Sequence, residues 1–322
     1  MTNSDDAGGG GSRLASSSRW SFLILGVLGM ALVICWGAAL LGGPLRVRSW
    51  LWLQSLVGFL GIFGLLFVLR RGTFKRRFGV ADAALLGASV IAIWPLGWGF
   101  NLFPVRYPAR LESTRPQLSV RLPSEHRVRV LWGGDFLARN YHAFVPNQRW
   151  AYDLGIEPVL TMSARLQDYG CYGTPVLAPV SATVGEVRDG LPDNVPGKLS
   201  MNFKAPEGNF VALQVSGGAL LILAHMQPGS ITVRAGDKVR EGEMLGHCGN
   251  SGNTSEPHIH IHLQRAPPSG KSLFLAEGLP LFFRDIDGPA MPQGGFRLNA
   301  GQVELLGDVL RPLSARSDRE TE

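Results

Sequence analysis

The hydrophobic pattern divides the chain into two different halves. The first half holds three stretches without Asp, Glu, Lys or Arg: Trp20–Leu45, Ser49–Leu69 and Ala83–Val105. At about 1.5 Å per residue, a helix made from any of them can cross a hydrocarbon core of about 30 Å. Three such runs, with no small-residue cleavage site after the first, predict three transmembrane helices over residues 20–105. The alternative is a soluble helical core. Residues 1–19, rich in Gly and Ser, predict a flexible tail.

The second half changes to short β-branched runs separated by Gly and Pro. These runs are Val176–Val180, Thr183–Val187, Phe210–Val215, Leu220–Leu223, Ser230–Val233 and Ile259–Leu263. Turn signals about every 8–12 residues predict an all-β antiparallel domain over residues 126–290. The aperiodic residues 106–125 predict a linker, and residues 291–322 a C-terminal extension and tail. Residues 188–209, polar and rich in Pro and Gly, predict a long surface loop.

The distribution of charge excludes nucleic-acid binding and predicts how the apolar first half is oriented in a membrane. The net charge of +6 lies entirely in residues 1–103, whereas residues 104–322 are neutral. A nucleic-acid-binding domain would itself be basic, so we exclude nucleic acid as a partner. Residues 70–77 carry five positive charges, which places this loop and the N-terminus in the cytoplasm. The chain is therefore predicted to be a multi-pass membrane protein, embedded in the lipid bilayer, with its β domain on the extracytoplasmic side.

Histidines form the clearest chemical pattern. His258, His260 and His262 alternate with apolar residues, so on a strand all three imidazoles share one face. His258 and His260 lie about 6.6 Å apart along such a strand, which suits one metal ligand and one neighbouring acid–base group. His262 lies about 13 Å from His258 and is not expected to reach the same ion. His247 is interpreted as a turn residue.

This region resembles a known family. The segment GNSGNTSEPHIHIHLQ resembles the signature strand of the lysostaphin/LytM-type zinc endopeptidases, in which a Gly-Ser-Gly turn leads into Pro-His-x-His. Four further segments are similar to that family: PVLAPVSATVGEV, GNFVALQVSGGALLILAHMQPGSI, VRAGDKVREGEMLGHCGNSG and NYHAFVPNQRWAYDLG. The resemblance covers about residues 126–268 and nothing before residue 105.

The resemblance implies a site of five residues. It makes His142, Asp153 and His260 the ligands of a Zn²⁺ ion, and His225 and His258 the catalytic histidines beside it. Two imidazoles and one carboxylate leave a coordination position open for water, as in catalytic zinc sites. The family's usual spacing is HxxxD, whereas ten residues separate the first two ligands here. His126 is the substitute for the first ligand, although the sequence around it has no match.

The resemblance also implies an activity: zinc-dependent cleavage of peptide cross-links in peptidoglycan, with peptidoglycan peptides as substrate. One alternative is a non-catalytic module that binds the wall or regulates other wall hydrolases. Another is a lipoyl-type carrier or phosphocarrier, because the turn around Lys238 is similar to theirs. Regulatory membrane or wall-synthesis partners are not identified by the sequence.

The three cysteines are divided between the halves. Cys35 lies in the first apolar run and is interpreted as a packing residue. Cys171 and Cys248 lie in the predicted outer domain, where an oxidising compartment favours a disulfide between them. The competing interpretation is a pair of buried thiols.

Overall fold

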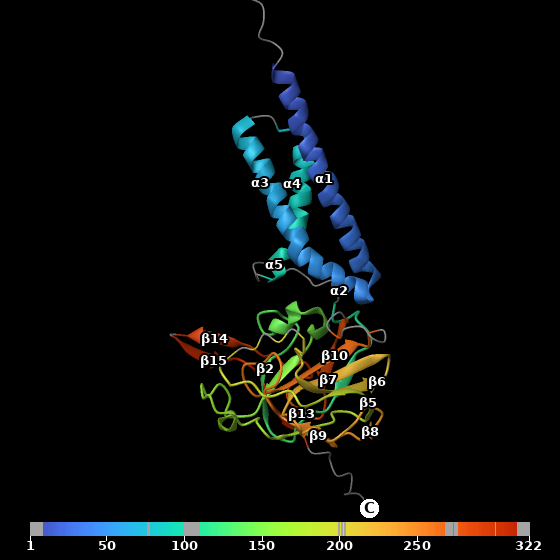
Figure 1. The fold of residues 1–322 in the computed structure, drawn as a ribbon, viewed down its shortest axis with the longest axis vertical. Helices are drawn as coiled ribbons and strands as arrows, with labels where there is room; N and C mark the ends of the chain where they lie inside the picture. Colours follow the sequence, from blue (N-terminus) through green and yellow to red (C-terminus); the bar gives the residue numbers. More distant parts are fainter. Residues whose placement is uncertain are drawn as a thin grey trace, which may run out of the picture. The chain divides into compact units, whose positions relative to one another are not determined.

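A computed structural model describes residues 9–75, 78–99, 110–198, 200, 202, 204–267, 273, 276–299 and 301–313. Contacts divide the chain into two compact units, Met1–Arg110 and Leu111–Glu322. The first unit is helical and the second is built from strands (Figure 1).

The helical unit contains α1 (Gly9–Leu41), α2 (Gly43–Trp52), the π-helical turn η1 (Leu53–Val57), α3 (Gly58–Lys75), α4 (Val80–Ile93) and α5 (Leu96–Gly99). Two segments within these helices are long and apolar enough to span a membrane, Arg19–Leu41 and Leu45–Gly72. The connection between them is short, because α1 ends at Leu41 and α2 begins at Gly43. The chain turns there at Gly42 and Gly43, which both have positive φ. Arg46 and Arg48, which lie between the first two apolar runs, belong to α2.

The prediction of three spanning helices is not met in the described residues, where two helices have the required length. The third run contains the shorter helix α4, which ends at Ile93, and a turn at Trp94–Pro95 separates it from α5. Proline has no N–H to donate and disfavours helical geometry at the residue before it, so Pro95 interrupts the run. Residues 100–105 lie outside the described part of the chain.

Glycines allow α3 and α4 to pack closely. A Cβ atom at Gly61 would lie 2.7 Å from the Cβ of Ala92, and one at Gly64 would lie 2.5 Å from the hydroxyl oxygen of Ser89. These approaches are closer than a side chain permits. Gly61 and Gly64 therefore serve helix contact, as small residues commonly do between apolar helices.

The second unit contains sixteen strands in its described residues. They are β1 (Leu118–Val120), β2 (Val128–Trp132), β3 (Tyr152–Gly155), β4 (Pro175–Leu177), β5 (Ala182–Arg188), β6 (Asn209–Val215), β7 (Ala219–Met226), β8 (Lys238–Val239), β9 (Met244–His247), β10 (Ile259–Arg265), β11 (Gly278–Leu279), β12 (Leu281–Phe283), β13 (Ile286–Asp287), β14 (Phe296–Asn299), β15 (Gln302–Leu305) and β16 (Val309–Pro312). Its described residues also contain the 3₁₀ turns η2 (Tyr141–Phe144), η3 (Pro146–Gln148) and η4 (Leu166–Asp168).

The main sheet has the order β13-β16-β2-β3-β10-β7-β6-β5-β8, with β11 also paired to β10. Its pairings are antiparallel, which confirms the predicted β class. The short pair β1–β12, outside this sheet, is parallel. Because β16 pairs with β2, the segment predicted as a C-terminal extension contributes to the sheet. The predicted linker also contributes, through β1, which begins at Leu118.

One predicted strand does not form. Ser230–Val233 has no strand assignment; instead the Thr232 N–H donates to the carbonyl of Leu245, and the Thr232 hydroxyl donates to that of Met244. The Ser230 hydroxyl donates to the Gln227 carbonyl. Serine and threonine side chains compete in this way with strand ladders for backbone partners.

The two faces of β10 have different surroundings. Ile259, Ile261 and Leu263 face the main hydrophobic core, which also contains Leu221 and Leu223 of β7. The opposite face carries the histidines, next to a small apolar cluster formed by Phe210, Ala212, Ile222 and Ala224. The alternation predicted for this strand is therefore present, with one face for packing and the other available for chemistry.

Candidate metal centre

Strand register brings the first two site residues together. In the antiparallel pairing of β10 with β3, His260 lies directly opposite Asp153. Side chains of such a pair project from the same face. His260 Nδ1 consequently lies 2.8 Å from Asp153 Oδ1, and both residues are buried.

His142 reaches the same carboxylate from the segment before β3. It lies in η2, and its Nε2 is 3.4 Å from Asp153 Oδ2. Asn140 fixes its orientation, since its Oδ1 lies 3.1 Å from His142 Nδ1 while its amide nitrogen donates to the carbonyls of Gly134 and Ala151. Because the Asn140 amide nitrogen already donates to these carbonyls, Asn140 Oδ1 accepts the hydrogen bond from the Nδ1–H group of His142. The lone pair of neutral His142 then lies on Nε2, which faces Asp153.

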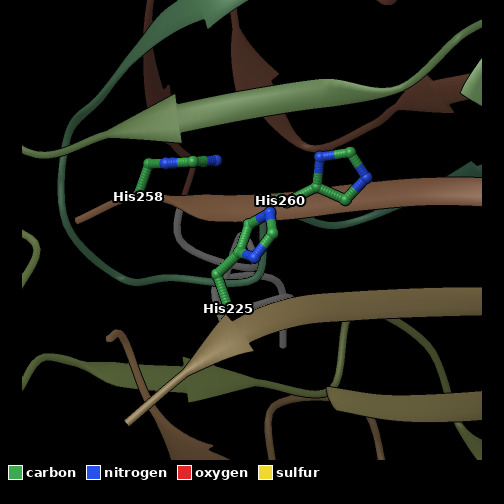
Figure 2. Close-up of side chains that lie close together, drawn as sticks. All are labelled: His225, His258 and His260. Carbon is green, nitrogen blue, oxygen red and sulfur yellow. The ribbon is translucent and has the colours of Figure 1, made fainter. Parts of the chain in front are cut away.

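His225 reaches the site because the end of β7 is irregular. Strand alternation would direct Ala224, which pairs with His260, toward the site and His225 away from it. Between Leu223 and Met226, however, β7 carries one residue more than β6 does, and His225 has a left-handed φ of 63°. Such bulges re-aim side chains, and Figure 2 shows His225 extending toward His260.

His225 and His258 are oriented alike by backbone carbonyls. His225 Nδ1 lies 2.7 Å from the carbonyl oxygen of Ser251, and His258 Nδ1 lies 2.7 Å from that of Glu256. A carbonyl can only accept, so each Nδ1 carries a proton, and in the neutral ring Nε2 presents the lone pair. The two rings lie edge to face, with centroids 5.0 Å apart.

Burial and the central carboxylate control the charge of the cluster. Burial lowers the pKa of His142 to about 3, although the charge of Asp153 opposes this. Burial also lowers the pKa of His225 well below its usual value. Burial disfavours the charged form of His258 too, yet the Asp153 carboxylate and the Glu256 carbonyl raise its pKa overall. For Asp153, burial alone would raise the pKa, but His142 and His258 bring it well below the ordinary value. The site therefore combines an ionised carboxylate with His142 and His225 held neutral, whereas Asp153 favours the charged form of His258.

This donor set fits a zinc ion. The nitrogen and oxygen atoms of His142, Asp153 and His260 lie within 4.8 Å of one another. Ligands bound at about 2.0–2.1 Å in a tetrahedron stand about 3.3 Å apart, close to the 3.4 Å between His142 and Asp153. Two imidazoles and one carboxylate also match the composition of catalytic zinc sites, which keep one position open. A second triplet, His225, His258 and His260, shares its last member with the first.

All five residues named from the sequence thus converge on one face of the sheet. His126 does not join them: it lies exposed at a bend before β2 and belongs to neither triplet. His247 ends β9 half-buried, and its backbone N–H donates to the Ser230 hydroxyl.

Sequence reasoning missed two neighbours of this cluster. Tyr141 stacks on His142 with ring centroids 4.0 Å apart. Burial, together with Asp153, raises its pKa. Asn140 was the other omission. Its position two residues before His142 at the start of a turn was the available signal, since Asn commonly caps such turns.

A disulfide joins the segment after η4 to the segment that leads into the turn behind His225. Cys171 and Cys248 are bonded, with Cα atoms 5.8 Å apart. Cys171 follows η4, whereas Cys248 precedes the turn whose residue Ser251 orients His225. The bond therefore ties the η4 segment to the turn behind His225.

Part of the β unit is similar in sequence to known peptidases. Residues 166–272 match the sequence profile of peptidase family M23. This range includes His225, His258 and His260, whereas His142 and Asp153 precede it. Peptidoglycan DD-endopeptidase ShyA of Vibrio cholerae is 26% identical over 133 residues, which make up 40% of this chain and 28% of ShyA. The match thus spans little more than a quarter of that relative.

Solved structures show similarity at lower identity. The catalytic domain of lysostaphin from Staphylococcus simulans is 22% identical, with a TM-score of 0.27, and the match covers 40% of this chain and 73% of that one. A zinc-containing peptidase from Vibrio cholerae is 17% identical, with a TM-score of 0.30 and coverages of 45% and 36%. The family match and the relative confirm the resemblance to the lysostaphin/LytM-type peptidases, and the match to peptidase family M23 covers residues 166–272 of the C-terminal unit.

Proposed function

We propose that this chain is a membrane-anchored, zinc-dependent endopeptidase that hydrolyses peptide cross-links of peptidoglycan. The observation that carries the proposal is the cluster itself, in which His142 Nε2, the Asp153 carboxylate and His260 Nδ1 face one shared space beside two further imidazoles. The M23 match and the activity named for ShyA support a peptidase acting on the cell wall.

In this proposal the three ligands hold the ion and the remaining histidines move protons. Zinc bound there would polarise the scissile carbonyl and acidify a water molecule. In their neutral forms His225 and His258 each present a lone pair on Nε2, so one of them can accept a proton from the attacking water and deliver it to the leaving amine. Their carbonyl partners at Ser251 and Glu256 keep both rings in the tautomer that this transfer requires.

Anchoring in a membrane is the second part of the proposal. Apolar side chains along α1 are exposed rather than packed: Met30 is 66% exposed, Val33 74% and Leu40 82%. In water such a surface would be unfavourable, whereas in lipid it is the expected one. The positive residues 70–77 would then face the cytoplasm and the M23 domain the wall.

The test uses the full chain purified in detergent. Wild-type protein should contain stoichiometric zinc by metal analysis and should release peptides from purified wall fragments, detected by mass spectrometry. Asp153→Ala and His260→Ala should lose zinc, while His225→Ala should retain zinc and lose activity. Full activity of the metal-depleted wild type would contradict the proposed mechanism. Stoichiometric zinc without hydrolysis would indicate a module that binds the wall or regulates other hydrolases.

The topology is tested separately in intact cells. Single cysteines introduced into residues 70–77 should resist a membrane-impermeant thiol reagent until the cells are lysed, whereas a cysteine at exposed Val195 should react before lysis. The reverse labelling pattern would contradict the proposed orientation.

A further inference from the structure

A row of buried polar side chains continues along β10 beyond the metal ligands. His262 and Gln264 follow His260 on the same face, and both are fully buried. His260 Nε2 lies 2.9 Å from His262 Nδ1, and His262 Nε2 lies 3.0 Å from Gln264 Oε1. The amide of Asn147, also fully buried, donates to the same Gln264 oxygen over 3.1 Å.

The backbone gives this row a single direction. The Gln264 amide nitrogen donates to the carbonyl oxygen of Leu273 over 3.3 Å, and a carbonyl can only accept. Gln264 Oε1 is therefore the end that faces His262, and it must receive a proton from His262 Nε2. A neutral imidazole has one N–H, so His262 Nδ1 is a lone pair that receives the proton of His260 Nε2.

The consequence appears at the far end of the row. With its proton on Nε2, neutral His260 has a bare lone pair on Nδ1, the atom 2.8 Å from Asp153 Oδ1. Two lone pairs at that distance repel each other unless a cation lies between them or a proton joins them. His142 is held in the same sense by Asn140, with its Nε2 lone pair toward Asp153.

The free-energy cost of burying this row of polar side chains argues against a purely structural role. His262 pairs across the sheet with Ile222 and lies beside an apolar cluster. An aliphatic side chain would avoid the penalty of burying and orienting two polar groups there.

We propose that His262, held by Gln264 and Asn147, is a positioning residue that fixes the tautomer of His260 and so raises the affinity of the site for a divalent cation. The inference rests on the proposed metal site and assigns no contact between His262 and the ion. Partners that orient a ligating histidine typically contribute a factor of about 10–100 to metal affinity.

The test compares two variants of the full chain in detergent. His262→Leu removes the acceptor for His260 Nε2, whereas His262→Asn retains one, because its Oδ1 can occupy the position of Nδ1. Zinc affinity, measured by chelator competition, should fall about 10–100-fold in His262→Leu and change less than about threefold in His262→Asn. Thermal unfolding of each metal-free variant shows whether it folds.

Equal zinc affinity in the two variants would overturn the inference. A wild type that binds no zinc would instead overturn the proposed function. Nitrogen-15 NMR of wild-type protein labelled at histidine gives a readout that needs no variant: His262 should carry its proton on Nε2 and not on Nδ1 in the zinc-loaded state. A proton on Nδ1 of His262 would refute the inference even if both variants failed to fold.

Discussion

Replacing Asp153 with asparagine isolates the contribution of charge at the centre of the site. The side chain keeps its size and one oxygen, but it loses the negative charge that faces His260 at 2.8 Å, His258 at 3.3 Å and His142 at 3.4 Å. A unit charge pair 4 Å apart is worth about 4 kcal/mol at an effective dielectric constant of 20. Because Asp153 is buried and already desolvated in the folded protein, little of this is offset when the ion binds. We therefore expect Asp153→Asn to weaken zinc binding by about 4 kcal/mol or more, which is about a thousandfold.

The assay is chelator competition on the full chain at neutral pH, with hydrolysis of wall fragments measured in parallel. Asp168→Asn serves as the matched control, since Asp168 is partly exposed at the end of η4 and belongs to neither histidine triplet. The control should bind zinc as the wild type does. If Asp153→Asn kept its zinc affinity within tenfold of wild type, the carboxylate would not be a ligand and the proposed site would be wrong.

Three further predictions concern acid, helix packing and the disulfide. The pKa of His142 in the folded protein, about 3, lies below its ordinary 6.5, so the unfolded chain binds more protons as the pH falls. His142 alone should therefore cost the metal-free protein about 2 kcal/mol of stability between pH 7 and pH 5 in urea unfolding, and His142→Gln should remove about that much of the loss. Gly64→Ala should lower the thermal midpoint of the helical unit in detergent, because its Cβ has no space, whereas Gly87→Ala, with no atom within 4 Å, should not. Cys171 and Cys248 should resist alkylation until the unfolded protein is reduced, and replacing both with alanine should cost about 2–4 kcal/mol.

The site was predictable from the sequence where local periodicity governs geometry. Alternation along Ile259–Arg265 alone places His260 and His262 on one face and the isoleucines on the other. The family resemblance supplied the remaining residues, including His142 despite its unusual spacing from Asp153. Local pattern could not supply His225, because strand alternation directs it away from the site and only the bulge against β6 with a left-handed backbone returns it.

The helical half was predicted less well in its details. Long stretches without charged residues identified the apolar runs, and two of these runs form helices long enough to span a membrane. The prediction of a third spanning helix was wrong because the length of an apolar run takes no account of proline. Pro95 lies in the middle of this run and interrupts the helix after Ile93. That signal was present in the sequence.

What the sequence determined by itself is the division into an apolar helical half and a β half, together with the residue types available for chemistry. Those properties depend on neighbours along the chain. The tertiary structure decided which nitrogen of each histidine is free, because each tautomer depends on an acceptor contributed from another position: Asn140 for His142, the Ser251 carbonyl for His225, and His262 with Gln264 for His260. Metal binding requires lone pairs that point to one place, and only the folded sheet brings these partners within hydrogen-bonding distance.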